Sequence, residues 1–199
     1  MKQCIKRIVS LICFIIVIPF YIIYKLESFI IKTEQPFCGM SQLFSLIPGL
    51  IGEYLRREFY KLSLKKCSDD CCISFGSIFS HPTAEIGKGV YIGAYCTIGN
   101  VSLGDNVLLA SNVDITSGKK QHSFENLELP IKEQKRNFEG ITVGEDTWIG
   151  NGAIIMANVG KKCVVGAGSV VIEEVEDYSI AAGNPARVIK KRERKSLSL

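Results

Sequence analysis

Histidine and tryptophan are scarce in this chain of 199 residues, which has two histidines, His81 and His122, and one tryptophan, Trp148. A zinc site of three histidines needs more than this pair. The eight cysteines show no secreted-scaffold spacing. The close group at positions 67, 71 and 72 lacks a second Cys/His pair, which disfavours zinc. We therefore expect no metal, and free thiols in this number suit a reducing compartment.

A basic stripe interleaved with aromatic residues is also absent, and the net charge is only +4. Nucleic acid is therefore disfavoured as a partner. The basic residues gather instead between Arg56 and Lys66 and in the tail KKRERK. Such clusters suit a membrane-proximal surface or an anionic cofactor.

One long uncharged apolar run is present, IVSLICFIIVIPFYIIY from Ile8 to Tyr24, with basic residues on both sides. Its 17 residues are at the short limit for a membrane span. No small-residue cleavage site follows, so a removed signal peptide is disfavoured. A buried helix of a soluble domain is the alternative, but Ile and Phe on all faces argue against it. We expect residues 1–35 to form a membrane-associated helical anchor.

A six-residue repeat fills the second half of the chain. From Ile86 it reads IGKGVY, IGAYCT, IGNVS, LGDNVL, LASNVD, IT, and from Val143 it resumes as VGEDTW, IGNGAI, IMAN, VGKKCV, VGAGSV, V. This spacing fits neither an amphipathic helix nor plain strand alternation, and it is the signature of a parallel β-helix. A β-sandwich would not hold the period in two separate blocks. Glycine after the aliphatic residue is expected to give backbone freedom where the chain bends.

The repeat also predicts which residues stack, because three units make one triangular rung of about eighteen residues. In the first block we expect Leu103 over Ile86, Leu109 over Ile92 and Ile115 over Ile98. In the second block we expect Val143, Ile149 and Ile155 to lie under Val159, Val165 and Val171. Small buried side chains should fill the fifth place of a unit, which Cys96 and Cys163 occupy.

The predicted architecture is mainly β, with a coil over residues 73–175 that is interrupted by a loop at 117–140. Residues 36–72 form an amphipathic connecting region. Its apolar part, Phe37 to Phe59, is expected to cap the first rung, because an open coil end exposes unpaired strand edges. Residues 176–199 are expected to cap the last rung and to end in a basic tail.

Three local matches carry a family resemblance. They are a loop that interrupts the coil, SGKKQHSF with His122; the block ITVGEDTWIGNGAIIM with Trp148; and the ending VVGAGSVV followed by AAGNPARVIKK. In this order and spacing they make residues 75–191 resemble the hexapeptide-repeat acyltransferases, most of all the sugar O-acetyltransferases such as the galactoside and maltose enzymes. The resemblance implies a left-handed β-helix, an exception to the usual right-handed crossover. It also implies a homotrimer with sites between neighbouring coils.

The resemblance further implies acetyl-CoA as the acyl donor. Trp148 is then expected beside the groove for donor and acceptor. Four small or amide residues match coil positions that run along pantetheine, and two basic residues match positions near the nucleotide end: Asn151, Gly152, Ala167, Gly168, Arg187 and Lys190. The repeat is two residues short at IMANVGKKC, so the groove near residues 157–162 is expected to differ from that of the family.

His122 is the candidate general base, because a histidine with a pKa near neutrality can accept the proton of an attacking hydroxyl. It matches the catalytic position of the family, and direct transfer without a covalent intermediate is expected. A carboxylate often orients such a ring, and four candidates lie in or beside the loop: Asp114, Glu125, Glu128 and Glu133. Of these we favour Glu133. His81 is interpreted as a structural residue of a turn, with acceptor binding as the alternative.

The chain is therefore predicted to be an acetyl-CoA-dependent O-acetyltransferase of cell-surface polysaccharide biosynthesis, with a sugar or lipid-linked saccharide as acceptor. The alternatives are N-acetylation of a nucleotide-linked amino sugar and a scaffold without catalysis, which would not need His122, its loop or the Trp148 block. A β-helix carbonic anhydrase needs a three-histidine zinc site. Serine acetyltransferase is disfavoured, because the N-terminal region is an apolar anchor rather than a long soluble helical domain.

Localisation poses a conflict, because acetyl-CoA is cytosolic whereas the positive flank before Ile8 favours an outside catalytic domain. Pro19 offers a resolution, since a break there could return the chain to the same face of the membrane. We expect a re-entrant or interfacial anchor in the bacterial inner membrane, with the coil on the cytoplasmic face. The cluster from Arg56 to Lys66 would then lie against anionic headgroups.

Overall fold

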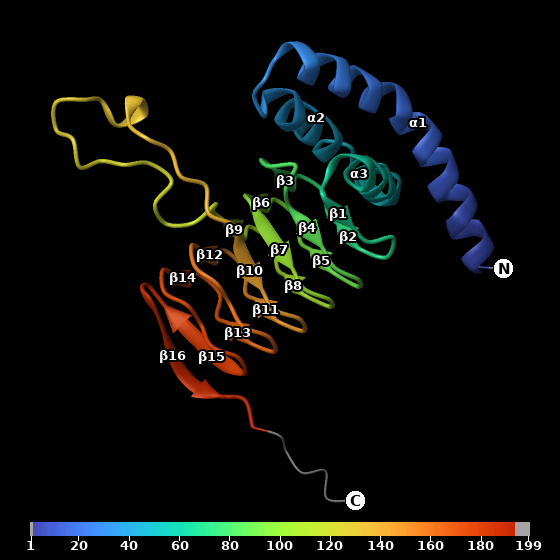
Figure 1. Ribbon diagram of the computed structural model, residues 1–199. Helices are drawn as coiled ribbons and strands as arrows, with labels where there is room; N and C mark the ends of the chain where they lie inside the picture. The colour runs from blue at the N-terminus through green and yellow to red at the C-terminus, as the bar shows by residue number, and fades with distance from the viewer. Residues whose placement is uncertain (1, 194–199) are drawn as a thin grey trace, which may run out of the picture.

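Three helices cover one end of a coil of short strands in the computed structural model, which describes the backbone of residues 2–193 and the side chains of residues 5–193 (Figure 1). The helices are α1 (Lys2–Ile30), α2 (Gln35–Ser45) and α3 (Gly49–Ser63), and a 3-10 turn, η1 (Ile131–Glu133), lies in the loop that leaves the coil. The coil is built from three sheets, in which strands from successive rungs pair in parallel. The expected β-helix is therefore confirmed.

Each sheet forms one side of the coil. The first sheet contains β1 (Lys66–Cys67), β4 (Glu85–Ile86), β7 (Val101–Leu103) and β10 (Ile141–Val143). The second contains β2 (Cys72–Ile73), β5 (Tyr91–Ile92), β8 (Leu108–Leu109), β11 (Trp148–Ile149), β13 (Val164–Val165), β15 (Ser179–Gly183) and β16 (Ala186–Lys191). The third contains β3 (Ile78–Phe79), β6 (Thr97–Ile98), β9 (Asp114–Ile115), β12 (Ile154–Ile155) and β14 (Val170–Val171).

All six predicted stacking pairs are confirmed. The pairs in the first block are Ile86 with Leu103, Ile92 with Leu109 and Ile98 with Ile115. The pairs in the second block are Val143 with Val159, Ile149 with Val165 and Ile155 with Val171. The two blocks join directly, because β10 pairs with β7 across the intervening loop. The stacked aliphatic side chains are buried and form the core of the coil, and Cys96 and Cys163 are buried with them.

The glycine after the inward residue is required by the close approach of the next rung, and not by the expected bend of the chain. A Cβ on Gly150 would lie 2.5 Å from the Ala167 nitrogen in the next rung, so only glycine permits this rung spacing. The left-handed backbone conformation occurs two residues later, at Gly152 and Gly168, and at Asn112 in the rung before them. Asparagine tolerates that conformation better than most residues, which is why the second position is less restricted to glycine.

The rungs become shorter toward the C-terminus. Val159 and Val175 follow Ile155 and Val171 by four residues each. Val159 bridges Val143 on one side and Val175 on the other through isolated bridges, without forming a strand. The irregularity predicted after Ile155 is therefore a repeat unit of four residues instead of six, and the inward residues on either side of it still stack. The final strand, β16, pairs antiparallel with β15 at the edge of the last rung. Residues 194–199 of the predicted tail lie outside the described residues.

Helix α1 is continuous from Lys2 to Ile30 and contains Pro19. The predicted break at Pro19, and the re-entrant path that depends on it, are therefore wrong. Packing explains the continuity, because α1 lies along α3 and α2 and buries Cys13, Val17 and Tyr24 against them. The segment Ile5–Ile30 is long and apolar enough to cross a membrane by length and composition, and only 17% of its most apolar window is buried.

Helices α2 and α3 cover the first rung. The amide of Phe79 in β3 donates to the Ser41 hydroxyl at 2.9 Å, and the amide of Gly76 donates to the Ser45 carbonyl at 2.9 Å. Aromatic rings fill the space between the helices and the rung, with Tyr60 4.8 Å from Phe79 between ring centroids. The three helices α1, α2 and α3 are called the helical layer below. This layer pairs backbone groups that would otherwise be exposed at the end of the coil.

Arg56 is fully buried, which corrects its predicted position at a membrane surface. Its guanidinium donates to the carbonyls of Ile47 at 2.7 Å, Ile73 at 2.8 Å and Phe44 at 3.1 Å. These bonds tie the end of α2 and the α2–α3 turn to the first rung. Burial lowers the pKa of Arg56 from its ordinary value, and the three carbonyl partners offset the cost of burying the charge.

The first rung begins at β1, before the predicted coil start at residue 73. Cys67 takes the inward place that an aliphatic residue holds in later rungs, since it pairs with Ile86. Cys71 takes the small buried fifth place, with 3% of its surface exposed. The sulfur atoms of Cys67 and Cys71 are 3.5 Å apart. The first unit therefore has cysteine at both the inward position and the fifth position. Because no aliphatic residue opens it, the repeat pattern does not reveal this unit in the sequence.

Candidate active site

The loop at 117–140 leaves the coil without disturbing it. Its two ends lie together, because the Glu139 amide donates to the Ser117 carbonyl at 3.0 Å. Figure 1 shows the loop, in yellow, projecting away from the sheets. The rung before the loop and the rung after it therefore stack as neighbours, and the loop is free to carry functional residues.

His122 lies in a short hairpin within this loop. It pairs with Arg136, and the flanking amides of Ser123 and Asn137 donate to Lys135 and Gln121 at 2.9 and 3.1 Å. A cavity of about 270 Å³ opens beside it. Its lining residues are Lys120, His122, Ser123, Phe124, Glu125, Lys135 and Asn137. Within the described part of the chain, the buried Nδ1 atom of His122 has no hydrogen-bond partner.

The favoured carboxylate, Glu133, lies on the exposed η1 turn and does not line the His122 cavity. Glu125 does line that cavity, so it is the carboxylate that the single chain places with His122. Asp114 lies in β9 and lines a separate hollow of about 310 Å³ together with His81. The choice of Glu133 stays a prediction.

His81 connects three parts of the molecule. Its Nδ1 atom is 2.5 Å from the Glu34 carboxylate in the α1–α2 linker, and its ring centroid is 5.0 Å from that of Phe138 at the base of the loop. Only 8% of its surface is exposed. These contacts favour the structural interpretation of His81, in which it fixes the loop base against the helical layer. Glu34 was missed, because nothing near it in the sequence marks it as the partner of a residue 47 positions away.

The predicted donor-binding residues gather on the second sheet and its adjoining corner. Trp148 is in β11 with 51% of its surface exposed. It is in register with Val164 and, through Val164, with Ile180, and Ile180 pairs with Lys190 in β16. Side chains in register share one side of a sheet. Trp148, Lys190 and Arg187, which pairs with Ala182, therefore lie on the same outer face.

The other four predicted residues form two stacked turns at the corner between the second and third sheets. The Gly168 amide donates to the Asn151 carbonyl at 2.8 Å, which places Ala167 and Gly168 directly beside Asn151 and Gly152. At Gly152 and Gly168 no atom lies within 4 Å of where a Cβ would be. The outer surface of this corner is therefore open to a ligand that runs along the backbone.

The single chain does not bring the two halves of the predicted site into one pocket. The His122 cavity is lined by loop residues alone, whereas the predicted donor-binding residues lie on the sheet and corner. Two further exposed side chains stand in line with Trp148 on the same face, Tyr91 and Leu108, each 43% exposed. Sequence reasoning missed this apolar ladder, although each member directly precedes the inward residue of the corresponding unit in successive rungs.

Two family models match the coil. The bacterial transferase hexapeptide model, of six repeats, matches residues 83–116, and the model for the hexapeptide repeat of succinyl-transferase matches residues 140–173. The coil of this chain therefore carries hexapeptide repeats of the kind that these two models describe. The expected resemblance is thus confirmed, and the two matched segments are the two blocks on either side of the His122 loop.

Curated relatives of this chain include enzymes named as sugar-modifying. The galactoside O-acetyltransferase of Escherichia coli is 37% identical over 53% of each chain. A putative lipopolysaccharide biosynthesis O-acetyl transferase of Escherichia coli is 31% identical over 58% of this chain and 61% of the relative. The chain spans about half the length of the curated relatives it matches.

Several solved structures share the fold of this chain. The maltose O-acetyltransferase from Clostridium difficile has a TM-score of 0.71 with 24% identity, over 80% of this chain and 87% of that one. Galactoside acetyltransferase in complex with coenzyme A has a TM-score of 0.68 with 25% identity, over 79% and 80%. An N-acyltransferase mutant from Bacillus cereus, in complex with an amino-sugar nucleotide and coenzyme A, has a TM-score of 0.53 with 25% identity, over 63% and 71%.

Proposed function

We propose that this protein transfers an acetyl group from acetyl-CoA to a sugar hydroxyl. One observation carries the proposal: the chain places its single loop histidine, His122, beside a cavity outside an otherwise regular coil. The coenzyme A complex of the structurally similar galactoside acetyltransferase supports the donor. The open corner at Gly152 and Gly168 supports a donor that lies along the backbone.

His122 acts as the general base in this proposal. The acceptor oxygen attacks the thioester carbonyl carbon as its proton passes to the imidazole. The tetrahedral intermediate then collapses, the C–S bond breaks, and the proton returns to the coenzyme A thiolate. A backbone N–H of the coil stabilises the oxyanion. A carboxylate on Nδ1 would hold the ring and favour the imidazolium, and Glu125 and the predicted Glu133 are the candidates.

The donor runs along the outer corner and the second sheet. Asn151 and the three small residues Gly152, Ala167 and Gly168 line its pantetheine arm, and Trp148 flanks the reacting end. Arg187 and Lys190 meet the anionic nucleotide end, where fixed positive charge is favourable. This arrangement uses the shared face that the sheet register gives to Trp148 and the two basic residues.

A homotrimer is part of the proposal. The exposed ladder of Tyr91, Leu108 and Trp148 supports a side-by-side packing of coils, because a row of large apolar side chains gains from being covered. The His122 loop would then reach the donor groove of a neighbouring chain and complete the site. Light scattering of the purified protein should give three times the chain mass, and a monomer that retains full activity would contradict this part.

The acceptor is proposed to be a sugar of cell-surface polysaccharide biosynthesis, free or lipid-linked. The lipopolysaccharide-related enzyme among the relatives supports this class. The apolar surface of α1 supports it too, since a lipid-linked acceptor would be met at a membrane. We propose an interfacial anchor in the bacterial inner membrane with the coil on the cytoplasmic face. Labelling of single-cysteine variants in intact cells should leave the coil unlabelled, and an externally labelled coil would rule this topology out.

The first experiment is an NMR spectrum of purified surface polysaccharide from cells with wild-type protein or His122→Ala. Loss of base-labile O-acetyl signals in the variant is expected, and the missing signal names the sugar position. Lys132→Gln is the matched control, because Lys132 is an exposed loop residue outside the cavity. An unchanged spectrum together with absent acetyl-CoA binding would overturn the proposal.

A second candidate is N-acylation of a nucleotide-linked amino sugar. The solved N-acyltransferase complex with such a sugar and coenzyme A is the observation that favours it. Loss of an N-acyl signal instead of an O-acetyl signal in the same spectra would place this candidate first.

A further inference from the structure

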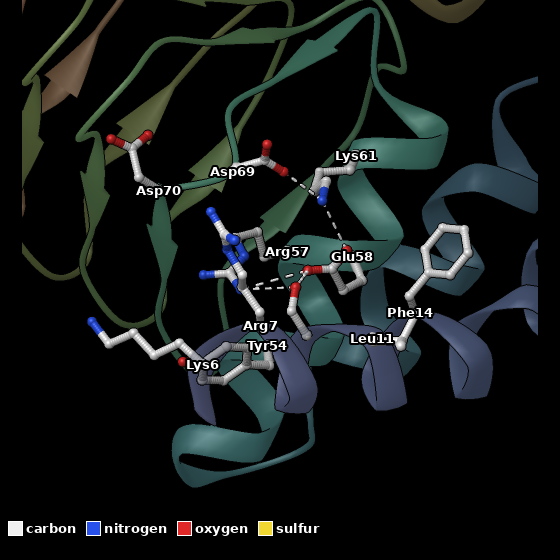
Figure 2. Close-up of a pocket in the computed structure, with 11 residues that line it drawn as sticks. Lys6, Arg7, Leu11, Phe14, Tyr54, Arg57, Glu58, Lys61, Asp69 and Asp70 are labelled. Carbon is white, nitrogen blue, oxygen red and sulfur yellow. Dashed lines mark hydrogen bonds and ion pairs between the residues drawn. The ribbon is translucent and has the colours of Figure 1, made fainter. Parts of the chain in front are cut away.

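A second cavity lies between the first half of α1, helix α3 and the β1–β2 turn, far along the chain from the His122 loop. Its volume is about 660 Å³. Figure 2 shows the lining, which combines charged and apolar side chains: Lys6, Arg7, Ser10, Leu11, Phe14, Tyr54, Arg57, Glu58, Lys61, Asp69 and Asp70. No step of the proposed acetyl transfer uses this cavity.

Arg57 lies in the wall of the cavity with its guanidinium stacked on Tyr54. Its guanidinium lies 4.5 Å from the centroid of the Tyr54 ring, so one face of the group is fixed by cation–π stacking. Its remaining contacts are long: 3.5 Å to the Ser10 hydroxyl and 3.5 Å to the Glu58 carboxylate. Its buried Nε has no partner within residues 5–193. A planar group with spare donors is suited to a bidentate acceptor such as phosphate.

The carboxylates of the cavity are already engaged. Glu58 is buried and accepts hydrogen bonds from the Ser10 hydroxyl at 2.5 Å and from the Lys61 ammonium at 3.0 Å. Lys61 also pairs with Asp69 at 2.5 Å. Asp70 accepts from the Ser68 hydroxyl at 2.6 Å, and that bond lowers the pKa of Asp70.

Two further cations stand on the α1 side of the cavity. Lys6 and Arg7 are exposed and make no ion pair with any described residue. Figure 2 shows Arg7 close to Arg57, with Lys6 at the edge of the same group. The lining holds four basic side chains (Lys6, Arg7, Arg57 and Lys61) against three acidic ones (Glu58, Asp69 and Asp70), and Arg57 shares Glu58 with Lys61. The excess positive charge therefore lies on the side of Lys6 and Arg7, beside Arg57.

The opposite lip of the cavity is apolar and continues into the exposed face of α1. Leu11 is 59% exposed, and Ile8, Ile12 and Ile15 on the same helix are 53%, 52% and 58% exposed. Phe14 lines the cavity beside Leu11. A soluble anion would need only the basic wall, whereas a lipid also covers the adjoining apolar surface.

We propose that this cavity binds the phosphate group of an anionic lipid, with Arg57 and Arg7 as its ligands and Lys6 at the rim. The acyl chains would lie along the exposed face of α1. The inference rests on the interfacial orientation proposed for α1 and does not depend on acetyl transfer.

Flotation of the full-length protein with vesicles tests this inference. Three vesicles are used: phosphatidylcholine alone, phosphatidylcholine with phosphatidylserine, and phosphatidylcholine with phosphatidic acid. Binding to the first reports the apolar anchor, and the second adds diffuse negative charge. The third adds an accessible phosphomonoester, and the difference between the third and the second reports the cavity.

Phosphatidic acid is expected to bind wild-type protein more tightly than phosphatidylserine does. Arg57→Gln should reduce that binding by roughly 10- to 100-fold, the range for a lost charged hydrogen bond. Arg57→Lys keeps the charge but loses the fork, so it should rescue only in part. Lys32→Gln, an exposed cation outside the cavity, should reduce binding by at most about fivefold.

Arg7→Gln provides a second variant in case Arg57→Gln disturbs the packing on Tyr54. Equal losses for Arg7→Gln, Arg57→Gln and Lys32→Gln would overturn the cavity in favour of diffuse attraction. Full displacement by inorganic phosphate at equal concentration would overturn the lipid as the source and assign a free phosphate. Absence of binding to phosphatidylcholine alone would contradict the interfacial anchor on which this inference rests and would overturn it. Acetyl-CoA binding by each variant reports separately on the proposed function.

Discussion

The coil and the helical layer are specified in different ways. In the coil each rung contacts its neighbours through the same interaction, an inward aliphatic residue stacked on another, so the information is local and repeated. In the helical layer the important contacts are single and distant in sequence. Ser10 bonds Glu58, and Arg56 bonds the carbonyl of Ile73. Loss of one residue should therefore affect the layer more than the coil.

The largest effect is expected from Arg56→Met. The substitution keeps the apolar part of the side chain but removes the guanidinium donor from the carbonyls of Ile47 and Ile73, whereas the Phe44 carbonyl keeps backbone donors. Each unpaired buried carbonyl costs about 1–3 kcal/mol, and relief of the buried charge offsets part of the sum. We expect a loss of about 3–5 kcal/mol in the free energy of unfolding, followed by circular dichroism in urea.

The control is Lys66→Gln, which removes an exposed charge from β1 and should change stability by less than about 0.5 kcal/mol. A small loss for Arg56→Met would show that the helices hold the first rung through their aromatic contacts alone. In that case the contrast between the coil and the helical layer would be weaker than proposed.

The same contrast explains what could be predicted from the sequence. Stacked pairs such as Ile92 with Leu109 were predictable, because the period-six spacing fixes them without knowledge of any other segment. The burial of Arg56 and the continuity of α1 through Pro19 were not, since both depend on packing between segments. A basic residue beside an apolar run looks the same in sequence whether it faces lipid or bonds carbonyls.

A core substitution in the coil should cost somewhat less. Ile92→Ala removes a fully buried side chain that stacks on Ile73 and Leu109. Loss of transfer free energy and the remaining cavity should cost about 3 kcal/mol in urea unfolding. Thr97→Ala, on the outer side of the next strand, is the matched control. A loss above that of Arg56→Met would reverse the proposed order of the two regions.

The residues of the candidate site also differ in whether the sequence pattern alone could reveal them. His122 was predictable, because it is the only histidine in a loop that breaks a regular repeat. The role of His81 was only half predictable, since its partners Glu34 and Phe138 come from two other segments. The carboxylate near His122 could not be chosen from spacing, because the irregular loop has no period to place Glu125 or Glu133.

Alkaline pH should destabilise the helical layer through Tyr60, by less than the two substitutions above. Tyr60 is fully buried, and burial raises its pKa above the unfolded value of about 10. Its contribution to stability is therefore complete below pH about 10 and is lost as the pH rises beyond it. Tyr60→Phe should lower the free energy of unfolding by about 1 kcal/mol at pH 7, because the hydrogen bond to Ser41 is lost. Between pH 9 and pH 11 the free energy of unfolding of Tyr60→Phe should fall less than that of wild type.

Urea unfolding of both proteins across that range provides the measurement. Burial also raises the pKa of Cys72 to about 11, and that effect is present in both proteins and cancels in the comparison. Parallel pH curves for wild type and Tyr60→Phe would show that Tyr60 can ionise without disturbing the layer.

The smallest change in stability is expected from removal of most of the loop. Deletion of residues 119–137 leaves Gly118 and Phe138 between Ser117 and Glu139, whose existing hydrogen bond then closes a four-residue turn. The shorter closure lowers the entropic cost of folding, which offsets the lost contacts within the loop. The free energy of unfolding should therefore stay within about 1 kcal/mol of wild type.

Acetyl transfer by this deletion variant should disappear while acetyl-CoA binding at the corner of Gly152 and Gly168 remains. Loss of both binding and transfer would mean that the loop forms part of the donor groove, and the proposed separation of base and donor surfaces would be wrong.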